Sequence, residues 1–137
     1  MARVLVPIAE GCEELEAVTI IDLLRRGGAE VVAAALHPGI VRASRGVHLK
    51  PDVTLEAVAE EDFDMVVLPG GAAGARALAA DDRVAELLRR HSQSGHYIAA
   101  ICAAPSVLAG AGLLAGKRAT SFPGWLDEAE DVDYRED

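Results

Sequence analysis

The chain has 137 residues, of which 51% are hydrophobic and 26% charged, proportions typical of one compact globular domain. Its formal net charge is −9 and no lysine- or arginine-rich block occurs, so nucleic acids and anionic membrane surfaces are not expected partners. Its two cysteines are too few for a disulfide scaffold, and they suit a reducing cytoplasm.

The first third of the chain alternates between strand and helix patterns. The apolar run at residues 3–9 predicts a buried strand. Residues 13–28 predict a helix, because acids stand in its first turn, arginines in its last, and two glycines end it. A second buried strand is expected over residues 30–36.

The middle of the chain continues this alternation. Residues 40–49 predict a hairpin or extended pair around the turn at 44–46. A short helix over 54–62, capped by Thr54, and an apolar strand over 64–71 follow. After a short helical turn, a helix is expected from Asp81, with four residues on one buried face: Val84, Leu87, Leu88 and His91.

Residues 97–116 carry no charge and are long enough to cross a bilayer. The run is nevertheless rich in alanine and glycine, is interrupted by Pro105, and lacks anchors at both ends. We therefore interpret it as a buried strand over 97–101, a turn at Cys102, and a helix over 103–112 with Pro105 in its first turn. The last segments predict a strand, then a loop or short helix, then the beginning of a strand: 117–122, 123–131 and 132–134.

Strands that alternate with helices, and that are mostly apolar on both faces, predict an α/β fold with a parallel sheet covered on both sides. In such folds ligands bind outside the carboxyl ends of the strands, near a switch in strand order. Three of the predicted strand ends carry polar, reactive or glycine residues. They are "AEGCEELE" at the end of the strand at 3–9, "PGG" at the end of the strand at 64–71, and "CAAP" after the strand at 97–101. If these strands are neighbours, their ends form one pocket with a thiol, carboxylates and free backbone amides.

Cys102 is the candidate nucleophile of that pocket. At a strand-to-helix turn, the unpaired N–H groups and the helix dipole are expected to lower its pKa below the free value of about 8.5. The alternative is a small buried core cysteine, the commoner case for a lone cysteine in apolar surroundings.

The glutamates at 13, 14 and 16 either complement the helix dipole or supply an acid/base partner for the thiol, and their spacing does not say which one does so. Gly70 and Gly71 either offer amides to an oxyanion or form a plain turn.

Four separated stretches closely resemble the ThiJ/PfpI superfamily, in the branch of the Parkinson-associated deglycase: "AEGCEELEAVTIIDLLRRGG", "ASRGV", "DMVVLPGG" and "AAICAAPSVLAGAGLLAGKRATSFP". The resemblance covers essentially the whole chain as a single domain over 1–137. It implies a flavodoxin-like three-layer sandwich and a homodimer. Members of the superfamily continue with a further strand and a C-terminal helix, so we expect the domain to be incomplete at its C-terminus.

The resemblance also assigns site residues. It makes Cys102 the oxidation-prone nucleophile and Glu16 the carboxyl that hydrogen-bonds its sulfur. Gly71 and Ala103 would supply backbone amides, and Arg45 would reach toward the site at the dimer interface. Ala103 stands where the protease-like branch has a histidine, which argues against a protease. Phe122 stands where some members have a histidine, which weakens any mechanism that needs an imidazole.

Two function classes follow from the resemblance. The first is a cytoplasmic, metal- and cofactor-independent enzyme of the glyoxalase or deglycase type, acting on methylglyoxal or its adducts in carbonyl or oxidative stress. The second is a redox-sensing chaperone whose Cys102 is oxidised to a sulfinate without turnover. Cys12 is either an incidental loop cysteine or the partner that resolves an oxidised Cys102.

Overall fold

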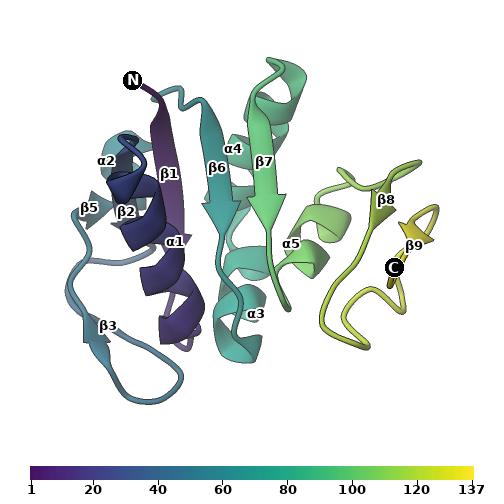
Figure 1. Cartoon of the computed structure of the whole chain (residues 1–137), viewed down its shortest axis with the longest axis horizontal. Coiled ribbons are helices and arrows are strands. Elements are labelled where there is room, and N and C mark those ends of the chain that lie inside the picture. Colours follow the sequence, from purple (N-terminus) through teal and green to yellow (C-terminus); the bar gives the residue numbers. More distant parts are fainter.

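The computed structural model describes all 137 residues and contains a five-stranded parallel sheet (Figure 1). The strand order is β5-β2-β1-β6-β7. These strands are β1 (Arg3–Ile8), β2 (Glu30–Ala35), β5 (Val53–Thr54), β6 (Met65–Leu68) and β7 (Tyr97–Ala100). Apart from the short edge strand β5, the chain order across the sheet is 2-1-3-4, which is the flavodoxin-like arrangement. The predicted α/β fold is therefore confirmed.

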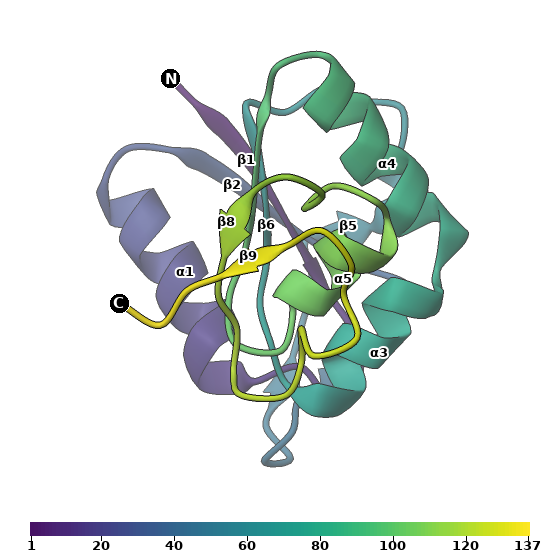
Figure 2. The same ribbon diagram turned by 90° about the vertical axis from the view of Figure 1, so that its right-hand side faces the viewer.

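Helices cover both faces of the sheet, but unequally (Figures 1 and 2). One face carries α1 alone, and the opposite face carries the other four helices. The helices are α1 (Glu14–Arg26), α2 (Leu55–Val58), α3 (Ala72–Ala80), α4 (Asp82–Gln93) and α5 (Pro105–Gly110). The three predicted layers are present.

The core forms two clusters because successive strand residues point to opposite faces. Val4 and Val6 of β1 pack beneath α1, together with Ala17 of that helix. Leu5, between them in the chain, packs on the other face with the buried residues of α2 to α5. This arrangement agrees with strands that are apolar on both faces.

The predicted apolar face of α4 is confirmed, since Val84, Leu87, Leu88 and His91 are all buried. Asp81 caps this helix by accepting a hydrogen bond from the Arg83 N–H. His91 is satisfied within the core: its Nδ1 lies 2.8 Å from the Leu87 carbonyl oxygen, and the Phe63 N–H donates to its Nε2 at 3.0 Å.

The hairpin predicted at 40–49 is present as the antiparallel pair β3 (Val41–Arg42) and β4 (His48–Leu49). The prediction that the Thr54 side chain caps the following helix is wrong. Thr54 occupies the N-cap position of α2, but its side chain makes no cap hydrogen bond.

The strand predicted at 97–101 is present, but it is not buried. β7 is an edge strand of the sheet, Tyr97 is 73% exposed and Ile101 is 48% exposed. Sequence hydrophobicity could not reveal this, because the position of a strand within a sheet depends on partners distant in the chain. In the 97–116 segment the strand is followed by a turn and the six-residue helix α5. None of the helices in this structure has the length and hydrophobicity needed to cross a bilayer.

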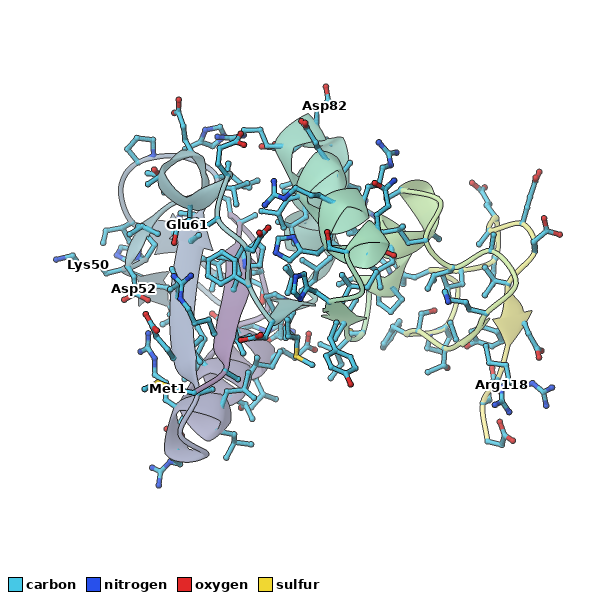
Figure 3. The ribbon with its side chains drawn as sticks, turned by 90° about the horizontal axis from the view of Figure 1, so that it is seen from above. Met1, Lys50, Asp52, Glu61, Asp82 and Arg118 are labelled. Carbon is cyan, nitrogen blue, oxygen red and sulfur yellow. The ribbon has the colours of Figure 1, made fainter.

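The strands predicted near the end of the chain form a separate small sheet. They are β8 (Arg118–Ala119) and β9 (Asp133–Tyr134), which pair with each other in parallel. Figure 3 shows this segment projecting from one side of the molecule, with Arg118 on the side opposite Lys50 and Asp52.

Candidate active site

The carboxyl ends of β1, β6 and β7 lie side by side, because these three strands are neighbours in the sheet. The connections that follow them line one cavity of about 550 Å³. It contains residues from all three predicted strand ends: Gly11, Glu13 and Glu16 after β1, Gly71 after β6, and Cys102 and Ala103 after β7. A second cavity of about 580 Å³, between α5 and residues 125–132, contains no cysteine or histidine, so we assign the candidate site to the first.

Cys102 occupies the turn between β7 and α5, as predicted. Its φ of 63° is in the left-handed region, which costs a non-glycine residue roughly 1 to 3 kcal/mol and is typical of functional turns. The turn is held by a hydrogen bond from the Phe122 N–H to the Cys102 carbonyl oxygen, at 2.8 Å. Ala104, not Cys102, is the N-cap of α5.

Glu16 is the glutamate that reaches this thiol. It lies in the first turn of α1, and its Oε1 accepts a hydrogen bond from the Gly70 N–H at 2.9 Å. A Cβ at Gly70 would lie 2.5 Å from that oxygen and 2.7 Å from the Cys102 Cβ. Only glycine at position 70 therefore allows the carboxylate and the cysteine to approach each other.

The electrostatics of the thiol differ from the prediction. Burial, the negative charge of Glu16 and the hydrogen bond that the thiol donates to this carboxylate together raise the pKa of Cys102. The N–H groups of Ala103 and Gly71 act in the opposite direction, but they do not prevail. The predicted lowering of the pKa is wrong, because a sequence pattern shows the helix start but not the carboxylate placed against the sulfur.

The backbone N–H groups that favour the ionised form of the Cys102 sulfur, and so act to lower its pKa, are those of Gly71 and Ala103. Gly71 has a φ of 93°, and a Cβ there would lie 2.5 Å from the Gly11 carbonyl oxygen and 2.6 Å from the Glu13 nitrogen. Glycine is thus needed for the loop after β6 to fit against the loop after β1. The structure brings these two amides together with the thiol and Glu16.

Arg45 lines the same cavity from the β3–β4 hairpin, with its guanidinium 3.8 Å from the Glu13 carboxylate. Its turn is anchored by Glu14, which accepts hydrogen bonds from the Ser44 hydroxyl and from the N–H groups of Arg45 and Val47. Although desolvation opposes ionisation, the hydrogen bonds from its own N–H and from these donors lower the pKa of Glu14 to about 2. The sequence did not reveal this anchoring role.

Cys12, by contrast, is fully buried in the loop after β1. Burial, with a smaller contribution from the charges of Glu14 and Glu10, raises its pKa to about 11. Both properties oppose an attack by its thiolate on an oxidised Cys102, so the structure favours the incidental reading of Cys12.

The remaining wall of the cavity is aromatic and basic. Phe122 and Trp125 line it, and the Arg76 guanidinium lies 5.1 Å from the centre of the Trp125 ring. Arg42 also lines it and was not predicted, although its position in the predicted hairpin, two residues before Ser44, was a usable signal. None of the four histidines lines the cavity, and no group of three or more His, Cys, Asp or Glu side chains is placed to hold a metal ion.

Comparison with known proteins shows which family has this sequence. Residues 2–136 match the model of the DJ-1/PfpI family. The chain is 44% identical over 136 residues to DJ-1 homolog B of Arabidopsis thaliana, covering 98% of this chain and 31% of that relative. It is 33% identical over 126 residues to a deglycase of Pyrococcus abyssi, covering 92% of this chain and 75% of that relative.

Solved structures agree. The oxidised DJ-1 of Toxoplasma gondii superimposes with a TM-score of 0.90 at 46% identity, covering 93% of this chain and 70% of that one. The chain spans about a third of the length of the Arabidopsis relative. From residue 2 to residue 136 its sequence fits one family, and this chain belongs to the DJ-1/PfpI family.

Proposed function

We propose that this protein is a cysteine-dependent enzyme of the glyoxalase or deglycase type, acting on small reactive carbonyls such as methylglyoxal or its adducts. The observation that carries the proposal is the contact between the Cys102 thiol and the Glu16 carboxylate in an open cavity. Membership of the DJ-1/PfpI family and the deglycase activity named for the Pyrococcus relative support the same chemistry. In the proposed reaction the thiol, the carboxyl and water exchange bonds and protons, and backbone N–H groups stabilise the negative charge that develops.

In the first step the sulfur adds to the aldehyde carbon of a 2-oxoaldehyde. A raised thiol pKa leaves Cys102 protonated at neutral pH, so the hydrogen bond to Glu16 is the route by which the proton leaves as the carbon–sulfur bond forms. Glu16 then passes this proton to the oxyanion, so the product is a neutral hemithioacetal and Glu16 is a carboxylate again. In this step the N–H groups of Gly71 and Ala103, which favour the ionised form of the sulfur, stabilise the oxygen on the adjacent carbon while it is negative.

In the second step a proton moves between the two carbons of the adduct. Glu16 removes the hydrogen of the former aldehyde carbon while the ketone oxygen takes up a proton from water, which gives an enediol. Glu16 then returns its proton to the former ketone carbon, and the hydroxyl on the former aldehyde carbon releases its proton to water, which gives a thioester. Water then hydrolyses the resulting thioester, releasing a 2-hydroxy acid and the free thiol. One carbon is oxidised and its neighbour reduced, so the reaction needs no external oxidant or reductant.

Lactate formation from methylglyoxal tests the proposal. The wild type and Cys12→Ser are expected to turn over, whereas Cys102→Ser loses at least about a thousandfold in rate, the scale on which removal of a nucleophile acts. A folded wild type that forms no lactate, or a Cys102→Ser variant as fast as the wild type, would overturn the proposal.

A second candidate function is oxidation sensing with a chaperone role, favoured by the partial exposure of Cys102 and by the oxidised state of the Toxoplasma relative. Two equivalents of peroxide convert the thiol to a sulfinate and leave two waters. The intact mass after mild peroxide treatment tests this function. A gain of two oxygens on Cys102 supports it, and an unmodified thiol contradicts it.

The proposed partner is a second copy of the chain, in the cytoplasm. The surface of α1 exposes Leu15, Val18 and Leu23, that of the hairpin exposes Val47, and Arg45 lies on the same hairpin at the cavity wall. Burying this surface in a dimer would remove apolar side chains from water. Light scattering is expected to give the mass of two chains, and the mass of one chain would refute the dimer.

A further inference from the structure

The cavity at Cys102 is much larger than the simplest carbonyl that the thiol could attack. Its volume is about 550 Å³, within the range of about 300 to 1,000 Å³ that is usual for sites of drug-sized ligands. Methylglyoxal has only five non-hydrogen atoms. The rest of the wall is therefore available to recognise a substituent beyond the reacting carbons.

Four charged residues line this cavity, and the side chains of three of them are already engaged. Glu16 accepts from the Gly70 N–H and from the Cys102 thiol. The Arg45 guanidinium pairs with Glu13 at 3.8 Å and donates to the Ser44 hydroxyl at 3.3 Å. The fourth is Arg42, whose guanidinium makes no hydrogen bond or ion pair within the protein, although its backbone N–H is bonded.

The backbone holds Arg42 firmly at this wall. Its N–H donates to the Glu10 carboxylate at 3.1 Å, and its carbonyl oxygen accepts from the Gly11 N–H at 2.9 Å. Its Nη2 lies 3.9 Å from the position that a Cβ at Gly46 would take, so the guanidinium extends over the hairpin turn. The loop that fixes Arg42 is the same one that leads into α1 and Glu16.

Arg42 thus places a guanidinium without an internal partner beside the Cys102 cavity of a protein whose net charge is −9. Its planar fork of donors matches carboxylate and phosphate oxygens. An anion bound at Arg42 would be repelled by Glu13 and Glu16, and its contact with the arginine would offset this repulsion.

We propose that Arg42 makes the Cys102 site selective for 2-oxoaldehydes that carry an anionic group, a carboxylate or a phosphate, at the end remote from the aldehyde. This inference rests on the proposed glyoxalase function for its reaction and leaves that reaction unchanged. The aldehyde lies at Cys102 and Glu16, while the anionic end lies at the hairpin. The product is then a 2-hydroxy acid with two acidic groups.

The test compares 4,5-dioxopentanoate with its uncharged methyl ester, which has the same reacting end. The wild type is expected to show a higher kcat/KM for the carboxylate, through a lower KM. Arg42→Gln is expected to reduce this preference about tenfold, as befits the loss of one charge-assisted contact. Equal kcat/KM values in the wild type, or an unchanged preference in Arg42→Gln, would overturn the inference.

Two further substrates separate the sources of the anion. If 3-phosphooxy-2-oxopropanal shows the same Arg42-dependent preference over methylglyoxal, the site accepts phosphate, and otherwise the ligand is the carboxylate. Arg118→Gln is the matched control, because Arg118 lies outside the cavity wall, on the projecting β8–β9 segment (Figure 3). A variant that is only partly folded still gives a valid result, because each preference is a ratio of two kcat/KM values measured on one preparation.

Alkylation gives a readout that does not depend on turnover. Iodoacetate and iodoacetamide differ in charge and hardly in size, so their relative rates at Cys102 report the attraction of an anion to the site. Arg42→Gln is expected to lower the iodoacetate-to-iodoacetamide ratio several-fold, whereas Arg42→Lys keeps most of it. An unchanged ratio refutes the role of Arg42. If the wild type turns over no substrate but the ratio falls, the glyoxalase proposal fails and the anion site stands.

Discussion

Cys12 and Cys102 follow two parallel strands of the same sheet, β1 and β7, and both connections contribute to the wall of the same cavity. In the loop after β1 the chain turns so that Cys12 is fully buried, with its backbone bonded to Ala9 and Ser44. In the turn after β7 the left-handed backbone of Cys102 brings its side chain to the cavity. The two thiols therefore differ in exposure because of local backbone geometry and not because of residue type.

The largest expected difference between the two thiols concerns Glu16, which contacts only Cys102. Glu16→Gln keeps an oxygen that can accept from the Gly70 N–H but cannot take a proton, so turnover of methylglyoxal is expected to fall about 100- to 10,000-fold. Steady-state lactate formation measures this loss. Glu14→Gln is the control, because Glu14 anchors the hairpin and makes no contact with the sulfur. Loss of turnover in both variants alike would contradict the assignment.

Alkylation of the native protein is expected to separate the two cysteines by about a hundredfold or more at pH 8. A pKa of about 11 leaves Cys12 almost wholly protonated there, and its burial blocks the reagent. The pKa of Cys102 is also raised, so its rate should still be rising with pH where that of free cysteine levels off near 8.5 to 9. Peptide mass spectrometry after timed iodoacetamide treatment follows each residue separately. Equal labelling of the two thiols would show that the burial of Cys12 is transient.

Alkaline pH should destabilise the fold through Cys12. Its pKa rises from 9.0 to about 11 on folding, so the unfolded chain loses this proton first and the free energy of unfolding falls as pH rises from 9 to 11. The contribution is about 2 to 3 kcal/mol, from roughly 1.4 kcal/mol for each pKa unit. Urea unfolding at several pH values is expected to show a smaller alkaline loss for Cys12→Ser than for the wild type. Parallel curves for the two proteins would refute the prediction.

Gly70→Ala should disturb Cys102 and spare Cys12. The new methyl group would lie 2.5 Å from the Glu16 Oε1 and 2.7 Å from the Cys102 Cβ, so the stability is expected to fall by about 1 to 3 kcal/mol and Cys102 alkylation to change. Gly110→Ala is the matched variant: it lies in α5 with open space around it and should stabilise by about 0.5 to 1 kcal/mol. Urea unfolding measures both, and a tolerated Gly70→Ala would show that the site has more room.

Much of this molecule follows from local sequence. The long strands β1 and β2, the helix α1 between its acids and glycines, the hairpin around Ser44 and the turn at Cys102 were all predictable, because hydrophobic periodicity and end signals act over a few residues. The convergence of three strand ends on one cavity was predicted only on the condition that these strands are neighbours, and the sheet order β1-β6-β7 meets that condition.

Other features were decided only by the tertiary structure, because each depends on groups that are far apart in the chain. Spacing did not single out Glu16 among three glutamates and only the family resemblance did so, because the hydrogen bond that holds its carboxylate comes from Gly70, fifty-four residues away. The raised pKa of Cys102 results from burial and from that same carboxylate, whereas the sequence showed only the helix that follows. The edge position of β7 and the unpaired Arg42 beside the cavity likewise depend on which segments pack together. Periodicity determined the elements of this protein, and long-range packing determined the charge, exposure and reach of the residues at its site.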